Sequence, residues 1–169
     1  MRTCKLFTLF VVLVLAASCH TWRKGHKDDA YTSLHKELKK ELPDAKVVKM
    51  KDSVKVIYTE VYMFDFGKDE IKLSALASFQ RFAAVLKREN QVYCIINGYT
   101  DNVGPDDVNN SLSLRRANNS KALLVSNGVD APRLTANGMG SSNPIMSNTT
   151  DEGRASNRRV EFVLYKNCK

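Results

Sequence analysis

The sequence predicts an α+β fold of two layers, and three observations support this prediction. Residues 68–88 carry apolar side chains at helical spacing, and residues 108–127 form a second helical segment that ends at Gly128. Short apolar runs come before, between and after these segments, in the order β-α-β-α-β-β. The 169 residues suffice for one domain with its own core. We therefore expect one α+β domain over residues 60–167, preceded by a shorter extension.

The extension, residues 31–59, is predicted to contain a helix and a β-hairpin. In residues 31–42 four apolar side chains recur at helical spacing: Tyr31, Leu34, Leu38 and Leu42. Pro43 follows the last of them, where a helix commonly ends. Residues 45–49 and 54–59 are rich in β-formers and are separated by turn-forming residues. We expect this extension to pack against the domain.

The domain is predicted to contain four strands, at residues 61–64, 91–97, 133–138 and 158–165. The second run, QVYCIIN, is almost wholly apolar, which is typical of a strand in the centre of a sheet. A long loop over residues 139–157 precedes the last strand. A loop of this length would normally count against a strand assignment, but here it fits a functional loop that carries a basic element.

The N-terminus has the three parts of a secretory signal. A basic start is followed by an apolar run, too short to span a bilayer, and by small residues that end at Cys19. This layout resembles a bacterial lipoprotein signal, although Ala16 stands where a leucine is usual. We expect residues 1–18 to be removed and Cys19 to carry acyl chains such as palmitate, with residues 19–30 as a flexible tether. The alternative is an ordinary signal peptide that is cut near Ala17 or Ser18 and leaves Cys19 as a spare thiol.

Charge indicates the class of partner. The chain has 26 basic and 18 acidic residues, a formal net charge of +8. Loss of Arg2 and Lys5 with the signal leaves 24 basic residues and a charge of +6. No zinc-finger spacing, RNP-like motif or basic zipper occurs. We expect an anionic polymer or lipid of the cell envelope as the partner, and no nucleic acid.

Two cysteines remain once Cys4 and Cys19 are assigned to the signal and the lipid site: Cys94 in a predicted strand and Cys168 near the end. An export compartment permits a disulfide between them, but a buried free thiol at Cys94 is equally ordinary. No cysteine or histidine spacing typical of a metal site occurs. We expect neither a metal nor another cofactor.

One stretch is more informative than the rest. Residues 97–116, NGYTDNVGPDDVNNSLSLRR, form a turn-rich loop with an acid, Asp101, that leads into a helix with an arginine, Arg116. A second basic element, EGRASNRRVEF, follows at residues 152–162. This ordered set, with GMG and NP between its two parts, resembles the OmpA-like peptidoglycan-binding domain (OmpA/Pal family) over residues 61–165. The resemblance implies a mixed four-stranded sheet with both helices on one face, in which the last strand lies antiparallel beside the second.

The resemblance also implies a binding site for the diaminopimelate of the peptidoglycan stem peptide. The free end of that residue has an ammonium and a carboxylate on one carbon. Asp101 matches the acid that binds the ammonium, and Arg116 matches the arginine that binds the carboxylate. Asn109 is expected to add a polar contact and to cap its helix. Arg158 is expected to face the ligand, and the turn at Gly67, where the family often has a polar residue, to offer backbone groups.

The function implied is non-catalytic. The protein would bind peptidoglycan and, through acyl chains on Cys19, tether the outer membrane to the cell wall from the periplasmic side. Other envelope proteins are further candidate partners. The alternative is an enzyme that cleaves or modifies peptidoglycan with paired acids, either Asp65 with Asp69 or Asp106 with Asp107. Against this, all three histidines precede the domain and no nucleophile elbow occurs.

Each site residue also has a purely structural explanation. Asp101 can stabilise its own turn, which aspartates in loops often do. One arginine of the pair at positions 115 and 116 belongs on a solvated helix face. One arginine of the pair at positions 158 and 159 can form an ion pair with Glu152 or Glu161.

Overall fold

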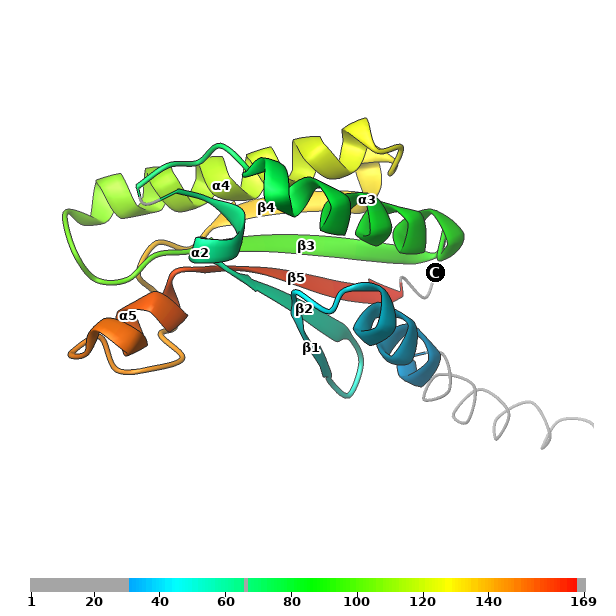
Figure 1. The fold of residues 1–169 in the computed structure, drawn as a ribbon, viewed down its shortest axis with the longest axis horizontal. Coiled ribbons are helices and arrows are strands. Elements are labelled where there is room, and N and C mark those ends of the chain that lie inside the picture. The colour runs from blue at the N-terminus through cyan, green and yellow to red at the C-terminus, as the bar shows by residue number, and fades with distance from the viewer. Residues whose placement is uncertain (1–30, 66, 167–169) are drawn as a thin grey trace, which may run out of the picture.

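The computed structural model describes residues 31–65 and 67–166. One layer is a mixed sheet with the strand order β1-β2-β5-β3-β4, in which β3 and β4 are parallel and the other neighbours antiparallel. Its strands are β1 (Lys46–Lys49), β2 (Val54–Thr59), β3 (Val92–Tyr99), β4 (Leu134–Gly138) and β5 (Arg159–Lys166). Figure 1 shows the two long helices side by side over one face of this sheet. The helices are α2 (Glu60–Met63), α3 (Leu73–Arg88), α4 (Asp106–Ser126), the short 3-10 turn η1 (Ala131–Arg133) and α5 (Asp151–Asn157).

The predicted α+β class is confirmed, but the sheet has five strands instead of four. Of residues 61–64, predicted as the first strand of the domain, the first three belong to helix α2, and Phe64 forms an isolated bridge with Ile71. The place beside β5 is taken by β2, which was predicted as one arm of a separate hairpin. Alternate residues of β2 are buried, so it has the pattern of a core strand. The chain leaves the sheet at Glu60, whose carbonyl accepts a hydrogen bond from the amide of Phe64 at 2.7 Å.

The N-terminal helix, described over residues 31–41, shares the core of the domain. Leu34, Leu38 and Leu42 are fully buried and belong to the same hydrophobic cluster as the sheet and α3. The hydroxyl of Tyr31 accepts a hydrogen bond from the amide of Lys166 at 2.9 Å. This contact places the start of the described chain beside the end of β5.

Aromatic rings fill the space between the sheet and α3. Phe162 on β5 makes edge-to-face contacts with Tyr58 on β2 and with two rings of α3, Phe79 and Phe82, at centroid distances of 5.2–6.0 Å. All four rings are fully buried. The hydroxyl of Tyr58 lies 2.8 Å from that of Ser78, so its polar end is satisfied in the interior. Edge-to-face pairs of this kind add to the stability that burial alone provides.

Helix α4 approaches the sheet closely where its buried face carries three small residues, Ser113, Ala117 and Ser120. Opposite them, a side chain at Gly98 would collide with the backbone carbonyl of Ser113. This close packing fixes the first half of α4 against the end of β3.

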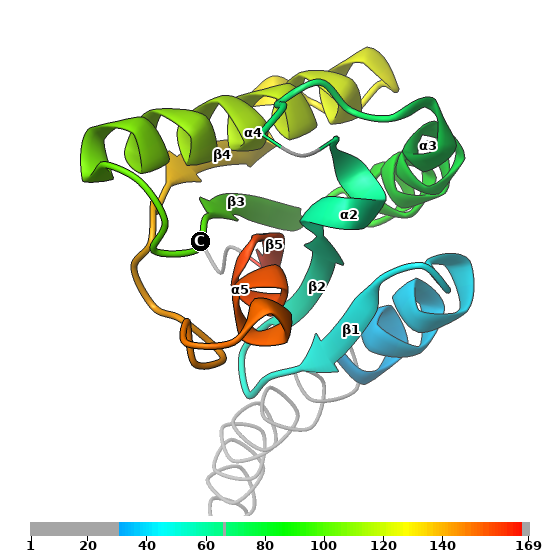
Figure 2. The same cartoon turned by 60° about the vertical axis from the view of Figure 1, so that its left-hand side comes forward.

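The long loop predicted over residues 139–157 contains helix α5. The Thr150 hydroxyl accepts a hydrogen bond from the Gly153 amide at 3.1 Å and so caps the helix. Figure 2 shows α5 standing at the end of the sheet where β5 begins.

The last strand is antiparallel to β3, as predicted, and Lys166 pairs with Val92. Cys94 is a buried free thiol in this structure, and burial raises its pKa. Cys168 and Cys19 lie outside the described residues, as do the predicted signal and tether, so the disulfide and the lipid anchor stay predictions. Within the described ranges, no helix is both long and apolar enough to cross a bilayer.

Candidate functional site

A pocket of about 560 Å³ opens where β3 ends. Its walls come from α2, the turn before α3, the loop after β3, the first half of α4, and α5, which Figure 2 shows grouped around the C-terminal end of β3. All five residues that the sequence predicted for the binding site line this pocket: Gly67, Asp101, Asn109, Arg116 and Arg158.

Asp101 lies two residues after the end of β3 and uses both of its oxygens. Oδ1 accepts a hydrogen bond from the amide of Val103 at 3.0 Å, so the aspartate does stabilise its own turn. Oδ2 forms an ion pair with Nη1 of Arg158 at 2.7 Å. The carboxylate therefore has both the structural role and a charged partner inside the pocket.

Arg116 is almost completely buried, with 1% of its surface exposed. Nε donates to the carbonyl of Lys68 at 2.8 Å, and Nη2 forms an ion pair with the carboxylate of Glu60. The guanidinium also lies over the ring of Phe64, with 5.0 Å between its central carbon and the ring centroid. Nη1 makes no hydrogen bond within the described chain.

Glu60 joins the two arginines of the pocket. Its second oxygen accepts from Nε of Arg158, so the four groups form one chain, Asp101–Arg158–Glu60–Arg116. We call this chain the pocket network. Burial would lower the pKa of Arg158, but its hydrogen bonds to Asp101 and Glu60 outweigh this and raise it. The pocket network holds two positive and two negative charges.

Two predicted residues shape the pocket through the backbone. Nδ2 of Asn109 donates to the carbonyl of Val103 at 3.1 Å and braces the loop that carries Asp101. The predicted helix cap at Asn109 is wrong, because α4 begins at Asp106 with Pro105 in the capping position. Gly67 has φ +70°, a conformation that favours glycine, and no atom lies within 4 Å of where a Cβ would stand.

The neighbours of the two pocket arginines point elsewhere. Arg115 is exposed on α4 and forms an ion pair with Asp69 at 2.5 Å, so it is the solvated member of its pair. Arg159 is buried, donates to Glu161 at 2.8 Å and lies over the ring of Tyr99 at 3.8 Å. Both outcomes agree with the structural explanations that the sequence suggested for one arginine of each pair.

Three pocket residues were missed by sequence reasoning. Glu60 lies between two runs predicted as strands, residues 54–59 and 61–64, and nothing in the sequence marks it as the bridge between two distant arginines. Thr100 has the one buried side-chain polar atom without a hydrogen-bond partner among the described residues, and it lines the pocket. Arg154 lies on α5 at the pocket wall and forms an ion pair with Asp151. The EGR motif was a usable signal for Arg154.

The paired acids considered for catalysis do not form a shared carboxylate pair. Asp65 forms an ion pair with Lys72 at 3.2 Å, and Asp69 pairs with Arg115. Asp106 and Asp107 are exposed in the first turn of α4, where negative charge favours the helix end. In the described part of the chain, no group of three or more His, Cys, Asp or Glu side chains is placed to hold a metal ion.

Curated relatives share sequence with most of this region. Outer membrane porin F of Pseudomonas fluorescens is 39% identical over 70% of this chain and 34% of its own length. "Probable lipoprotein YiaD" of Escherichia coli is 41% identical over 60% of this chain and 46% of its own length. "Peptidoglycan-binding protein ArfA" of Mycobacterium tuberculosis is 44% identical over 59% of this chain and 31% of its own length. The chain thus spans about a third to a half of these relatives.

Solved structures have the same fold. A MotB-like protein from Desulfovibrio vulgaris is similar with a TM-score of 0.79 and 26% identity, over 84% of this chain and 98% of that one. The peptidoglycan-associated lipoprotein of Burkholderia pseudomallei has a TM-score of 0.57 and 27% identity, over 68% and 90% of the two chains. The model of the OmpA family matches residues 63–158, more than half of the sequence. The chain belongs to the OmpA family.

Proposed function

We propose that this protein binds peptidoglycan without cleaving it, through the diaminopimelate of the stem peptide, and holds the outer membrane to the cell wall. The observation that carries the proposal is the convergence of Asp101, Arg116 and Arg158 on one pocket. Relatives whose names state peptidoglycan binding, such as ArfA, and the fold shared with the peptidoglycan-associated lipoprotein support it.

The charges of the pocket suit a zwitterionic end. An ammonium at the pocket entrance would bind the carboxylate of Asp101, which has acceptor capacity beyond its two protein bonds. A carboxylate on the same carbon would bind Nη1 of Arg116 and the guanidinium of Arg158 with charge-assisted hydrogen bonds. The hydroxyl of Thr100 and the backbone at Gly67 are the neutral groups that would complete the site.

The acids of the pocket hold positions that favour binding over hydrolysis. Both oxygens of Glu60 are engaged with arginines, and Asp101 is paired with Arg158. We therefore assign these carboxylates to positioning and to ligand charge.

Membrane attachment would come from Cys19. Two or more acyl chains give stable anchoring, whereas one gives only marginal binding. Mass spectrometry of the N-terminus of the native protein is expected to show an acylated cysteine. An unmodified terminus near residue 18 would refute the anchor and leave the binding site untouched.

Sedimentation with purified peptidoglycan sacculi tests the proposed binding. Residues 20–169 contain every residue of the hydrophobic core, so they are a suitable form for the assay. We expect them to sediment with sacculi, to be released by free diaminopimelate, and to liberate no soluble muropeptides. Binding that diaminopimelate fails to compete would overturn the stem-peptide site. Release of muropeptides would overturn the non-catalytic function.

A further inference from the structure

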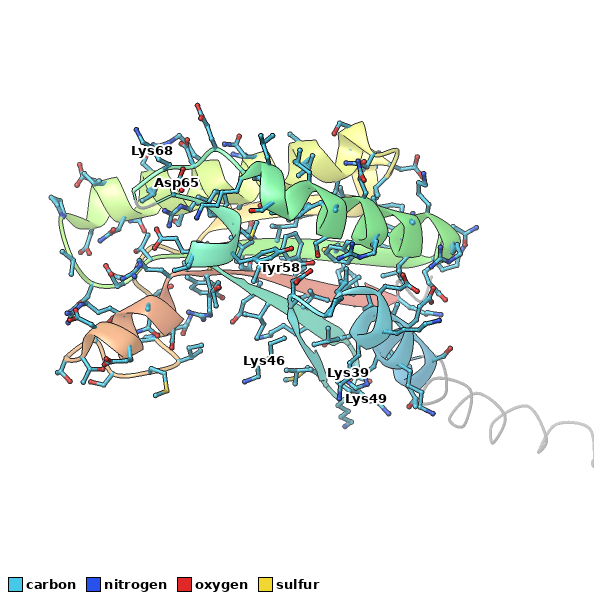
Figure 3. All side chains as sticks on the ribbon, in the orientation of Figure 1. Lys39, Lys46, Lys49, Tyr58, Asp65 and Lys68 are labelled. Carbon is cyan, nitrogen blue, oxygen red and sulfur yellow. The ribbon has the colours of Figure 1, made fainter. Side chains whose placement is uncertain are left out.

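A second surface of the domain carries a dense group of exposed lysines. They project from the N-terminal helix, from β1 and from the β1–β2 turn, and we call this surface the lysine face: Lys36, Lys39, Lys40, Lys46, Lys49 and Lys51. Figure 3 shows Lys39, Lys46 and Lys49 on the side of the molecule that faces away from α3 and α4. Nothing in the proposed wall-binding site uses this surface.

Two acids of the same segments, Glu37 and Asp44, face the rest of the domain, whereas Asp52 is exposed in the β1–β2 turn beside Lys51. Glu37 forms an ion pair with Arg88 at 2.5 Å, and Asp44 forms one with Arg81 at 3.2 Å, both of them arginines of α3. The lysines of the face have no comparable neutralisation, because none forms an ion pair with another described residue. The six lysines outnumber the two remaining acids of these segments, Glu41 and Asp52, so the outward charge of this surface is positive.

An apolar side chain stands at the tip of the lysine face. Met50 occupies the turn between Lys49 and Lys51, and 46% of its surface is exposed. It lines a groove of about 400 Å³ together with Ile145 and Met146, which are also exposed. Lysines around exposed apolar side chains are the pattern of a surface that rests on a bilayer, with the charges at the headgroups and the apolar atoms just below them.

The lysine face lies where the chain would leave the membrane. Tyr31 is hydrogen-bonded to the end of β5, and Lys49 donates to Thr32 at 2.5 Å. Eleven residues separate Tyr31 from Cys19, and such a segment spans at most roughly 40 Å. An anchor at Cys19 would therefore hold this end of the domain close to the headgroups of the membrane.

We propose that the lysine face docks on an anionic phospholipid surface. The proposal relies on the anchor proposed above to bring the domain close to the membrane. The attraction between lysines and anionic headgroups does not itself need the anchor. Docking would orient the domain. Arg158 immediately precedes β5, and Tyr31 lies at the other end of that strand. Eight strand residues span about 23 Å, so the pocket would stand about that far from the end of the domain that the anchor holds.

Vesicle sedimentation tests this proposal with unlipidated residues 20–169. We expect binding to vesicles that contain phosphatidylglycerol, little binding to pure phosphatidylcholine vesicles, and weaker binding as salt is raised. Lys39→Glu combined with Lys46→Glu is expected to reduce binding to the anionic vesicles by about tenfold or more. The matched control is Lys87→Glu with Lys121→Glu, which changes the net charge equally but lies on α3 and α4.

The outcomes separate the two proposals. Lysine-face variants that lose vesicle binding but keep sacculus binding would support docking. Equal losses in the control pair would overturn it, because the effect would then follow net charge alone. Absence of binding to anionic vesicles by the folded wild-type chain would also overturn it. Loss of sacculus binding in the lysine-face variant would assign the surface to the wall polymer instead of the membrane. A wild-type protein that fails to bind sacculi would count against the proposed function only.

Discussion

Two buried ion networks lie side by side in this domain and have different consequences. The pocket network includes Arg158, and the next residue, Arg159, begins a second network with Glu161 and Lys55, which we call the sheet network. Arg116, Arg159 and both network glutamates are at most 4% exposed. Burial and ion pairing alone therefore do not identify which network binds a ligand.

The two networks differ in how completely their buried groups form hydrogen bonds within the protein. In the sheet network, Nε, Nη1 and Nη2 of Arg159 all donate to the protein, and both oxygens of Glu161 are taken by Arg159 and Lys55. In the pocket network, Nη1 of Arg116 makes no bond within the described chain, and the network opens onto a cavity. A network whose groups all bond within the protein, a closed network, stabilises the fold. A network with a group that faces a cavity, an open network, can also form a hydrogen bond with a ligand.

The largest expected effect is the loss of binding in Arg116→Ala. Removal of this arginine leaves the ligand carboxylate without its partner, at a cost of about 2–5 kcal/mol. Titration of diaminopimelate by calorimetry would measure it, together with a thermal melt, since Glu60 also loses a partner. The control is Arg115→Ala, whose exposed pair with Asp69 contributes about 0–1 kcal/mol. Equal losses of binding in both variants would indicate unspecific attraction by basic charge.

Asp101→Asn separates the turn from the charge. The asparagine oxygen can still accept from the amide of Val103, so the loop is expected to keep its conformation. The charged bond to the ligand ammonium is lost, and we expect affinity to fall by about 1.5–3 kcal/mol. Unchanged affinity in a folded Asp101→Asn variant would remove this residue from the site.

Glu60→Gln is expected to change selectivity. With Glu60 the pocket network is neutral, and without its charge the site is left with one acid and two arginines. We expect the preference for zwitterionic diaminopimelate over pimelate, which lacks the ammonium groups, to fall on the order of tenfold. Loss of a negative charge a few ångströms away weakens the attraction for the ammonium of diaminopimelate and strengthens the attraction for a carboxylate of either ligand. Competition against sacculus binding would give the ratio. An unchanged ratio would reduce Glu60 to a structural role.

The sheet network is expected to act on stability alone, through pH. Burial would raise the pKa of Glu161, but its hydrogen bonds to Lys55 and Arg159 outweigh burial and hold the pKa below its usual value. A lowered folded-state pKa stabilises the protein above the ordinary glutamate pKa of about 4.3, and this contribution is lost as pH falls through the folded value. The free energy of unfolding of wild type should exceed that of Glu161→Gln at pH 7, and the gap should narrow in acid. A gap that stays constant with pH would contradict this.

The sequence was most informative where one local pattern decides the outcome. The helical period of α3 and the apolar run of β3 were read correctly, although α3 begins at Leu73 and not at residue 68. The run after Thr59 was misread, because TEVYM has the composition of a strand and only the pairing of β2 with β5 excludes it from the sheet. Glu60 was missed for the same reason. Its partners are 56 and 98 residues away, so its role exists only in the folded chain.

An NMR titration of the isotope-labelled domain with diaminopimelate tests most directly whether the open network is the binding site. We expect the largest amide shifts at Gly67, Asp101 and Val103, around the pocket, and only small ones at Glu161 and Lys55 in the sheet network. The Arg116→Ala variant should lose these shifts and keep a folded spectrum. Shifts centred on the sheet network or on the lysine face, or a spectrum unchanged at millimolar ligand, would contradict the account.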